Sequence, residues 1–121
     1  MNSIFHGNIN HITEDNTYYR RVLETTPNMQ LVVMSLAPLE EIGSEVHEYT
    51  TQFIRVESGQ GIAVINGKYY ELSDDVAVVI PLDTQHNIIN TSTIEPLKLY
   101  TIYSPPNHPK GTLESFKPES D

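Results

Sequence analysis

Short runs rich in apolar residues, several of them alternating with polar ones and most followed by turn residues, recur along this chain. Their β-branched and aromatic content is typical of strands. The runs that fit are residues 18–23, 30–37, 52–56, 62–65, 68–72, 76–80, 86–90 and 97–103. Asn66-Gly67, between two of these runs, is the strongest hairpin signal in the sequence. The almost wholly apolar run 76–80 predicts a strand buried on both faces.

The first 26 residues show no clean helical stripe, and the rest of the chain adds almost no helix signal. Many short strands with a turn every eight to twelve residues or so indicate an all-β sandwich or barrel, and a jelly-roll barrel suits their number. A chain of 121 residues is long enough for one apolar core. We therefore predict a single domain over 1–121, with a barrel core over about 18–104 and a polar C-terminal tail over 105–121.

Composition excludes several classes of function. Cysteine is absent, which removes disulfides, thiolate metal ligands and cysteine nucleophiles and fits a reducing compartment. The apolar runs are shorter than the ~18 residues of a membrane span, and the N-terminus lacks the form of a signal peptide. The formal net charge of −9 repels phosphate backbones. We expect a soluble, cytoplasmic protein without a membrane or nucleic-acid partner.

Residues with metal-ligand chemistry gather near the middle of the chain. Glu45 and His47 are two positions apart, so on an extended strand both side chains leave the same face. Gln52 can return to the same point after a turn, and His86 stands at the start of a distant strand-like run. We predict that the four form a mononuclear metal site. The alternatives are exposed polar residues on a half-solvated strand, or a degenerate site that holds only a polar network.

Two motifs in this region resemble those of the cupin superfamily, specifically the small single-domain cupins. The first reads Glu45-x-His47-x4-Gln52-x6-Gly59. The second reads Pro81-Leu-Asp83-Thr-Gln-His86-Asn-Ile-Ile-Asn90. The motifs and the hairpin between them cover about half of the chain and keep the family's register. The resemblance implies a double-stranded β-helix, which is a jelly-roll barrel.

The resemblance also implies a ligand set, with two changes. The family site is three histidines and a glutamate around manganese, iron, nickel, zinc or copper, whereas here Glu45 replaces the first histidine and Gln52 replaces the glutamate. The implied ligands of one divalent ion are thus Glu45, His47, Gln52 and His86. Two imidazoles and a carboxylate suit Mn, Fe, Ni or Zn, and the sequence does not choose among them. Gln52, a weak amide ligand, either binds at longer range or hydrogen-bonds a metal-bound water.

Other residues near the motifs have predicted places. Tyr49 is in phase with His47, so on a regular strand it lines the pocket or packs as a core aromatic. Ile54 and Ile88 are expected to line the barrel and keep the pocket narrow and dry. Arg55 is out of phase and is expected to face away, where it pairs with an acidic neighbour or with a partner subunit. The remaining histidines are expected to be solvated: His6, His11 and His108.

The function implied by the resemblance is metal-dependent binding or chemistry on a small oxygenated metabolite. If the protein is an enzyme, oxygenase, decarboxylase and sugar isomerase reactions all stay open, because the sequence shows no second acid or base near the site. The alternative is a non-catalytic small-molecule-binding or structural cupin. A homodimer is a further family-level expectation, formed through apolar edges at residues 18–23 and 31–36.

Overall fold

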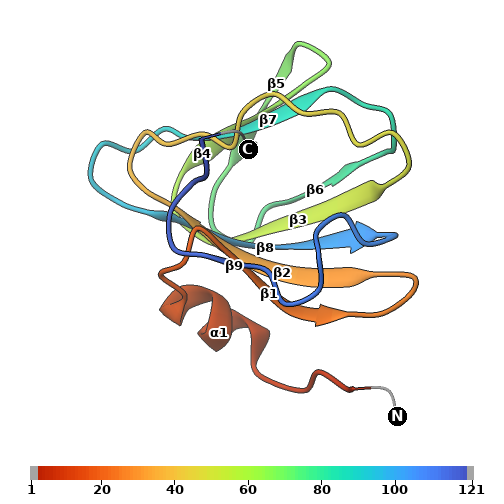
Figure 1. The fold of residues 1–121 in the computed structure, drawn as a ribbon. Helices are drawn as coiled ribbons and strands as arrows, with labels where there is room; N and C mark the ends of the chain where they lie inside the picture. Colours follow the sequence, from red (N-terminus) through yellow and green to blue (C-terminus); the bar gives the residue numbers. More distant parts are fainter. Residues whose placement is uncertain (1–2, 120–121) are drawn as a thin grey trace.

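The computed structural model describes residues 3–119 and arranges the strands in two antiparallel sheets, with a helix outside the larger one (Figure 1). This arrangement confirms the expected all-β, double-stranded β-helix fold. The elements are α1 (Ile9–Asp15), β1 (Arg20–Thr25), β2 (Gln30–Leu36), β3 (Thr51–Ser58), β4 (Gly61–Ile65), β5 (Lys68–Leu72), β6 (Ala77–Ile80), β7 (His86–Asn90), β8 (Leu97–Ser104) and β9 (Leu113–Glu114).

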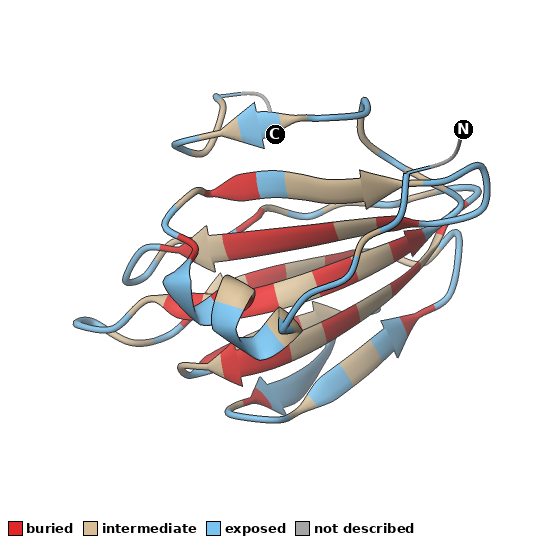
Figure 2. Cartoon of the chain, turned by 90° about the horizontal axis from the view of Figure 1, so that it is seen from below, coloured by how far each residue is buried: buried red, intermediate tan, exposed pale blue. Residues whose placement is uncertain are grey.

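The larger sheet has the strand order β6-β3-β8-β2-β1-β9, and the smaller sheet has the order β5-β4-β7. Alternate residues of each strand face the space between the sheets because side chains change face at every position. The core cluster there includes Val32, Met34, Ile54, Leu99 and Ile88, each no more than 1% exposed. The buried stripes of the larger sheet run side by side along its strands in Figure 2.

The predicted β4–β5 hairpin is present. Asn66 and Gly67 have φ values of 50° and 80°, which is the pair of positive φ values that a type I′ turn needs. The pairing of Ile65 with Lys68 closes the turn directly. Local sequence therefore accounts for the turn of this hairpin, while β4 also pairs with β7 along its length.

The helix α1 was not expected from the sequence. It has seven residues, and Asn8 caps it by accepting a hydrogen bond from the His11 amide at 2.9 Å. Two turns are too short to show a helical period, so the helix depends on packing against the outer face of the larger sheet, where Figure 2 shows it. Val33 of β2, which points to that outer face, is 0% exposed. Within the described residues no helix is long and apolar enough to cross a membrane.

The prediction that residues 76–80 are buried on both faces is wrong. β6 pairs only with β3 in the larger sheet, and Val79 is 62% exposed while Ile80 is 1% exposed. An edge strand of this sheet has a single buried face, so its apolar outward residues meet solvent. Apolar composition alone did not distinguish this strand from a central one.

The C-terminal tail is not simply a polar tail. Within it, β9 pairs with β1, so that Arg20 lies opposite Glu114 and the two side chains form an ion pair. The Lys117 ammonium then donates to the Glu41 carbonyl at 2.7 Å. As a result, part of the β1 edge is covered, and β2 lies between β1 and β8. β2 is therefore not an edge strand, the β1 edge is free only beyond its pairing with β9, and the homodimer itself stays a prediction.

Asn90, the last residue of the second motif, joins three segments at the end of β7. Its amide donates to the carbonyls of Leu36, Ala37 and Glu95 at 2.9–3.1 Å, and the side chain is fully buried. We expect Asn90→Ala to lower the free energy of unfolding by about 2–4 kcal/mol, because several buried carbonyls lose their donor. Urea denaturation measures this. Asn87→Ala, on the same strand but half-buried, is the control, and an equal loss in both variants would contradict the assignment.

Candidate metal centre

Glu45 and His86 lie opposite each other because the chain before β3 runs antiparallel to β7. The Glu45 amide donates to the His86 carbonyl at 2.8 Å, and the His86 amide donates back at 2.9 Å. This reciprocal pair places both side chains on the same face. The predicted extended segment at 45–47 therefore exists, although it forms bridges to β7 rather than a strand of its own.

His47 is positioned by the loop of the second motif. The Asp83 amide donates to the His47 carbonyl at 2.8 Å, and Asp83 has a φ of 58°. Glycine adopts a positive φ most readily, and aspartate is among the few other residues that tolerate it. The loop that contains Asp83 therefore ties His47 to the segment that leads into His86.

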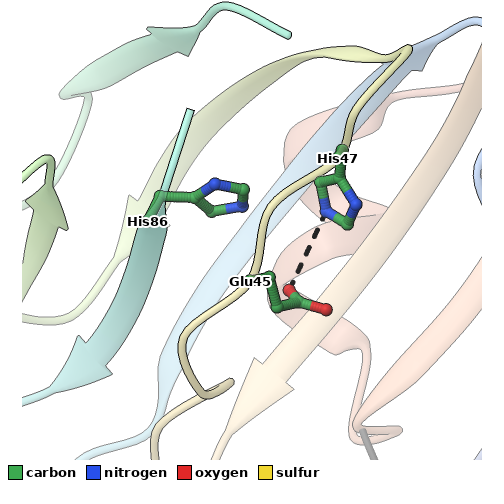
Figure 3. A group of neighbouring side chains, drawn as sticks. All are labelled: Glu45, His47 and His86. Carbon is green, nitrogen blue, oxygen red and sulfur yellow. Dashed lines mark ion pairs between the residues drawn. The ribbon is translucent and has the colours of Figure 1, made fainter. Parts of the chain in front are cut away.

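Glu45, His47 and His86 form a cluster whose potential ligand atoms all lie within 4.8 Å of one another (Figure 3). His47 Nε2 is 3.9 Å from Glu45 Oε1, and the two imidazole centroids are 5.1 Å apart. Two atoms bonded to one ion at about 2.0–2.2 Å are separated by no more than about 4.4 Å. The three donors are therefore close to the spacing of ligands on a single ion, and the widest pair would approach by a few tenths of an ångström on binding.

The hydrogen bonding of His86 fits a metal ligand. Its Nδ1 is 2.9 Å from the Thr84 carbonyl oxygen, which can only accept, so Nδ1 carries the proton. The lone pair of the neutral ring is then on Nε2, which is buried and has no hydrogen-bond partner within residues 3–119. Metal-binding histidines are commonly oriented by such an Nδ1–H to carbonyl bond. A buried nitrogen lone pair that lacks a donor is costly unless something occupies it.

Gln52 is buried at the start of β3, at 3% exposure. Its Nε2 donates to Thr101 Oγ1 at 3.0 Å, and its Oε1 has no hydrogen-bond partner in the described chain. Gln52 lies opposite Tyr103 in the β3–β8 pairing, and the Tyr103 ring is 5.8 Å from the His47 ring. The structure therefore brings Gln52 to the end of the barrel that holds the three donors. Its direct coordination stays a prediction.

Comparison with known proteins identifies the fold family. A model of the cupin domain matches residues 32–103, which is more than half of the chain and contains both motifs. The chain belongs to the cupin domain family. The predicted resemblance is thereby confirmed, and the matched region contains Glu45, His47 and His86.

Three proteins similar to this cupin have high sequence identity. Uncharacterized protein L612 of Acanthamoeba polyphaga mimivirus is 45% identical over 124 residues, which are 99% of this chain and 77% of L612. Protein YrkC of Bacillus subtilis (strain 168) is 43% identical over 119 residues, which are 93% of this chain and only 63% of YrkC. The crystal structure of BH2720 from Bacillus halodurans has a TM-score of 0.92 at 40% identity and covers 95% of this chain and 91% of that one.

The structure corrects one predicted pocket residue and places two others. Tyr49 is 80% exposed, because a turn at residues 48–49 ends the extended segment after His47, so neither predicted inward role is correct. Ile54 and Ile88 are inward and belong to the core cluster at 0% and 1% exposure. Both keep the interior of this cupin apolar, and their contact with a ligand stays a prediction.

Arg55 faces outward, as expected from the alternation along β3. Its guanidinium donates to Asp75 at 2.9 Å. The hydrogen bond to this carboxylate, aided by Tyr100 and by the charge of Glu57, raises the pKa of Arg55 above its usual value. This cation therefore stabilises the outer surface and takes no part in the donor cluster.

Sequence reasoning missed Gln30 and Tyr103, which extend the row of Gln52 and Ile80 across the larger sheet. The strand pairings align the buried, inward residues Gln30, Tyr103, Gln52 and Ile80. Tyr103 is in phase with Leu97 and Leu99, so the alternation along β8 could have shown that it faces inward. Its position beside His47 depends on how the sheets pack, which no local pattern reveals.

Proposed function

We propose that this cupin binds one divalent metal ion through Glu45, His47 and His86, and that Gln52 orients a water or oxygenated ligand on that ion. The observation that carries the proposal is the buried lone pair of His86 Nε2, which has no partner in the described residues and lies in a cluster with the other two donors. Mn, Fe, Ni and Zn are all compatible with two imidazoles and one carboxylate.

The donor set favours a small oxygen ligand. One carboxylate and two neutral imidazoles would leave a divalent ion with a net positive charge, which attracts carboxylate or enolate oxygens. The apolar interior below the site, with Ile54 and Ile88 buried, lowers the local dielectric and strengthens such contacts. A metal ion held there would supply Lewis-acid polarisation of a bound oxygen. The Gln52 amide can orient that oxygen or a water beside it.

Catalysis and simple binding are both consistent with this site. Oxygenase, decarboxylase and isomerase chemistry would each begin with an oxygenated substrate bound to the ion. A non-catalytic cupin that binds a small molecule is the second candidate, because the buried Ile54 and Ile88 make the interior of the barrel apolar. Ligand-dependent thermal stabilisation without turnover would identify that case.

The test is metal content measured after purification without chelator. We expect about one divalent ion per chain, a fall in melting temperature when it is removed, and recovery when it is restored, because an ion that binds only the native state stabilises that state. For the Mn²⁺ form, water-proton relaxation reports an exchangeable water on the ion. A protein that takes up no metal and melts at the same temperature with and without chelator would contradict the proposal.

A further inference from the structure

We infer that Tyr103 and His108 are positioning residues of this metal centre, and that a stack of three rings, clamped by Gln30, sets the direction of the His47 imidazole. The inference rests on the proposed function, because it concerns how a ligand of the proposed ion is held. Gln30, Tyr103 and His108 all lie outside the two motifs.

The Tyr103 ring lies between the rings of His47 and His108 and contacts both. The His47 and Tyr103 centroids are 5.8 Å apart with the planes at 87°. The Tyr103 and His108 centroids are 5.2 Å apart with the planes at 81°. Both contacts are edge-to-face, which is a favourable arrangement for aromatic rings at these separations. Tyr103 is 3% exposed, so the middle ring of the stack is fixed within the core.

Gln30 fixes the outer end of the stack. Its Oε1 accepts from the amides of Asn107 and His108 at 3.2 and 3.0 Å. Its Nε2 donates to the His108 carbonyl at 2.8 Å and to Thr25 Oγ1 at 3.0 Å. Gln30 is fully buried and lies opposite Tyr103 in the β2–β8 pairing. One amide therefore holds the His108 backbone against the strand that carries the middle ring.

The segment that carries His108 is also tied to the loop that follows His47. Thr50 Oγ1 donates to the Pro105 carbonyl at 3.2 Å, and Ser104 Oγ donates to the Asn28 carbonyl at 2.9 Å. These bonds hold residues 104–108 over the same end of the barrel as the donors. Movement of this segment would thus reach His47 through both the ring stack and the backbone of its loop.

The direction of the His47 ring decides where its potential ligand nitrogen points, and Tyr103 packs edge-to-face against that ring. The His86 ring is oriented in a different way, by the hydrogen bond between its Nδ1 and the Thr84 carbonyl. Loss of a group that orients a metal ligand typically lowers metal affinity by roughly 10- to 100-fold. We expect an effect in that range when the stack is broken.

The experiment compares Co²⁺ binding by the full chain and by variants of the stack, using chelator competition and the visible spectrum. His108→Ala and Tyr103→Leu are expected to weaken Co²⁺ binding by about 10-fold or more and to change the spectrum. Tyr103→Phe keeps the ring and is therefore expected to retain more Co²⁺ affinity than Tyr103→Leu. His11→Ala, on exposed α1, is the control. Native affinity and spectrum in both disrupted variants would overturn the inference.

A second readout separates this inference from the proposed function. In metal-free protein, the ring current of Tyr103 affects the NMR chemical shifts of the His47 ring protons, so these shifts report how the two rings are placed. His108→Ala is expected to shift these signals, and His11→Ala is not. If the native chain takes up no metal, the proposed function fails and the NMR comparison alone decides the positioning role. Unchanged His47 signals in His108→Ala would then overturn it.

Discussion

His86→Ala is expected to abolish stoichiometric metal binding. The substitution removes the buried Nε2 lone pair, and the two donors left, Glu45 and His47, are the more exposed members of the cluster, at 22% and 10% of their side chains against 3% for His86. We expect the metal affinity to fall by more than about 100-fold, which exceeds the loss typical of a residue that only orients a metal ligand. Metal analysis of chain purified without chelator measures the loss.

A fall in metal content could also follow from misfolding, so the His86 experiment needs two controls. His11→Ala removes a histidine whose side chain is 73% exposed and is expected to keep the native metal content. The melting temperature of metal-free His86→Ala is expected to stay close to that of the metal-free native chain. Removing the buried unpaired nitrogen stabilises the variant, and this offsets the stability lost with the packing of the ring. A folded His86→Ala protein with one ion per chain would exclude His86 as a ligand.

The part of the site that could be predicted is the part determined by short-range geometry. Alternation along an extended chain places Glu45 and His47 on one face, and this holds because β7 pairs with that segment. Alternation also placed Arg55 outside the barrel, where it bonds Asp75. The same rule failed at Tyr49, because it says nothing about where the extended segment stops and the turn at residues 48–49 begins.

The parts that could not be predicted depend on contacts between distant segments. The exposure of Val79 follows from the edge position of β6, which the apolar sequence of that strand does not encode. His108 was expected to be solvated, yet its ring packs on Tyr103 because Gln30 binds its backbone from a strand 78 residues away in sequence. The seven-residue α1 is likewise stabilised by the sheet it covers.

Gln52→Glu is expected to have opposite effects on metal-free and metal-loaded protein. Gln52 is 3% exposed, and its Oε1 has no partner in the described residues, so a carboxylate in its place would be buried without compensation in the metal-free chain. We expect the free energy of unfolding of that form to fall by about 1–3 kcal/mol. In the loaded form the carboxylate adds a charged ligand where the amide was weak, so metal affinity is expected to rise by about 10-fold or more.

The two effects of Gln52→Glu are measured on the same samples by thermal melts with chelator and with added Mn²⁺. The metal-dependent rise in melting temperature is expected to be larger in Gln52→Glu than in the native chain, because tighter binding to the native state adds stability. Gln60→Glu, at an exposed turn before β4, is the matched control and is expected to change neither melt. An unchanged metal-dependent rise in Gln52→Glu would show that residue 52 does not face the ion, and the site would then consist of Glu45, His47 and His86 alone.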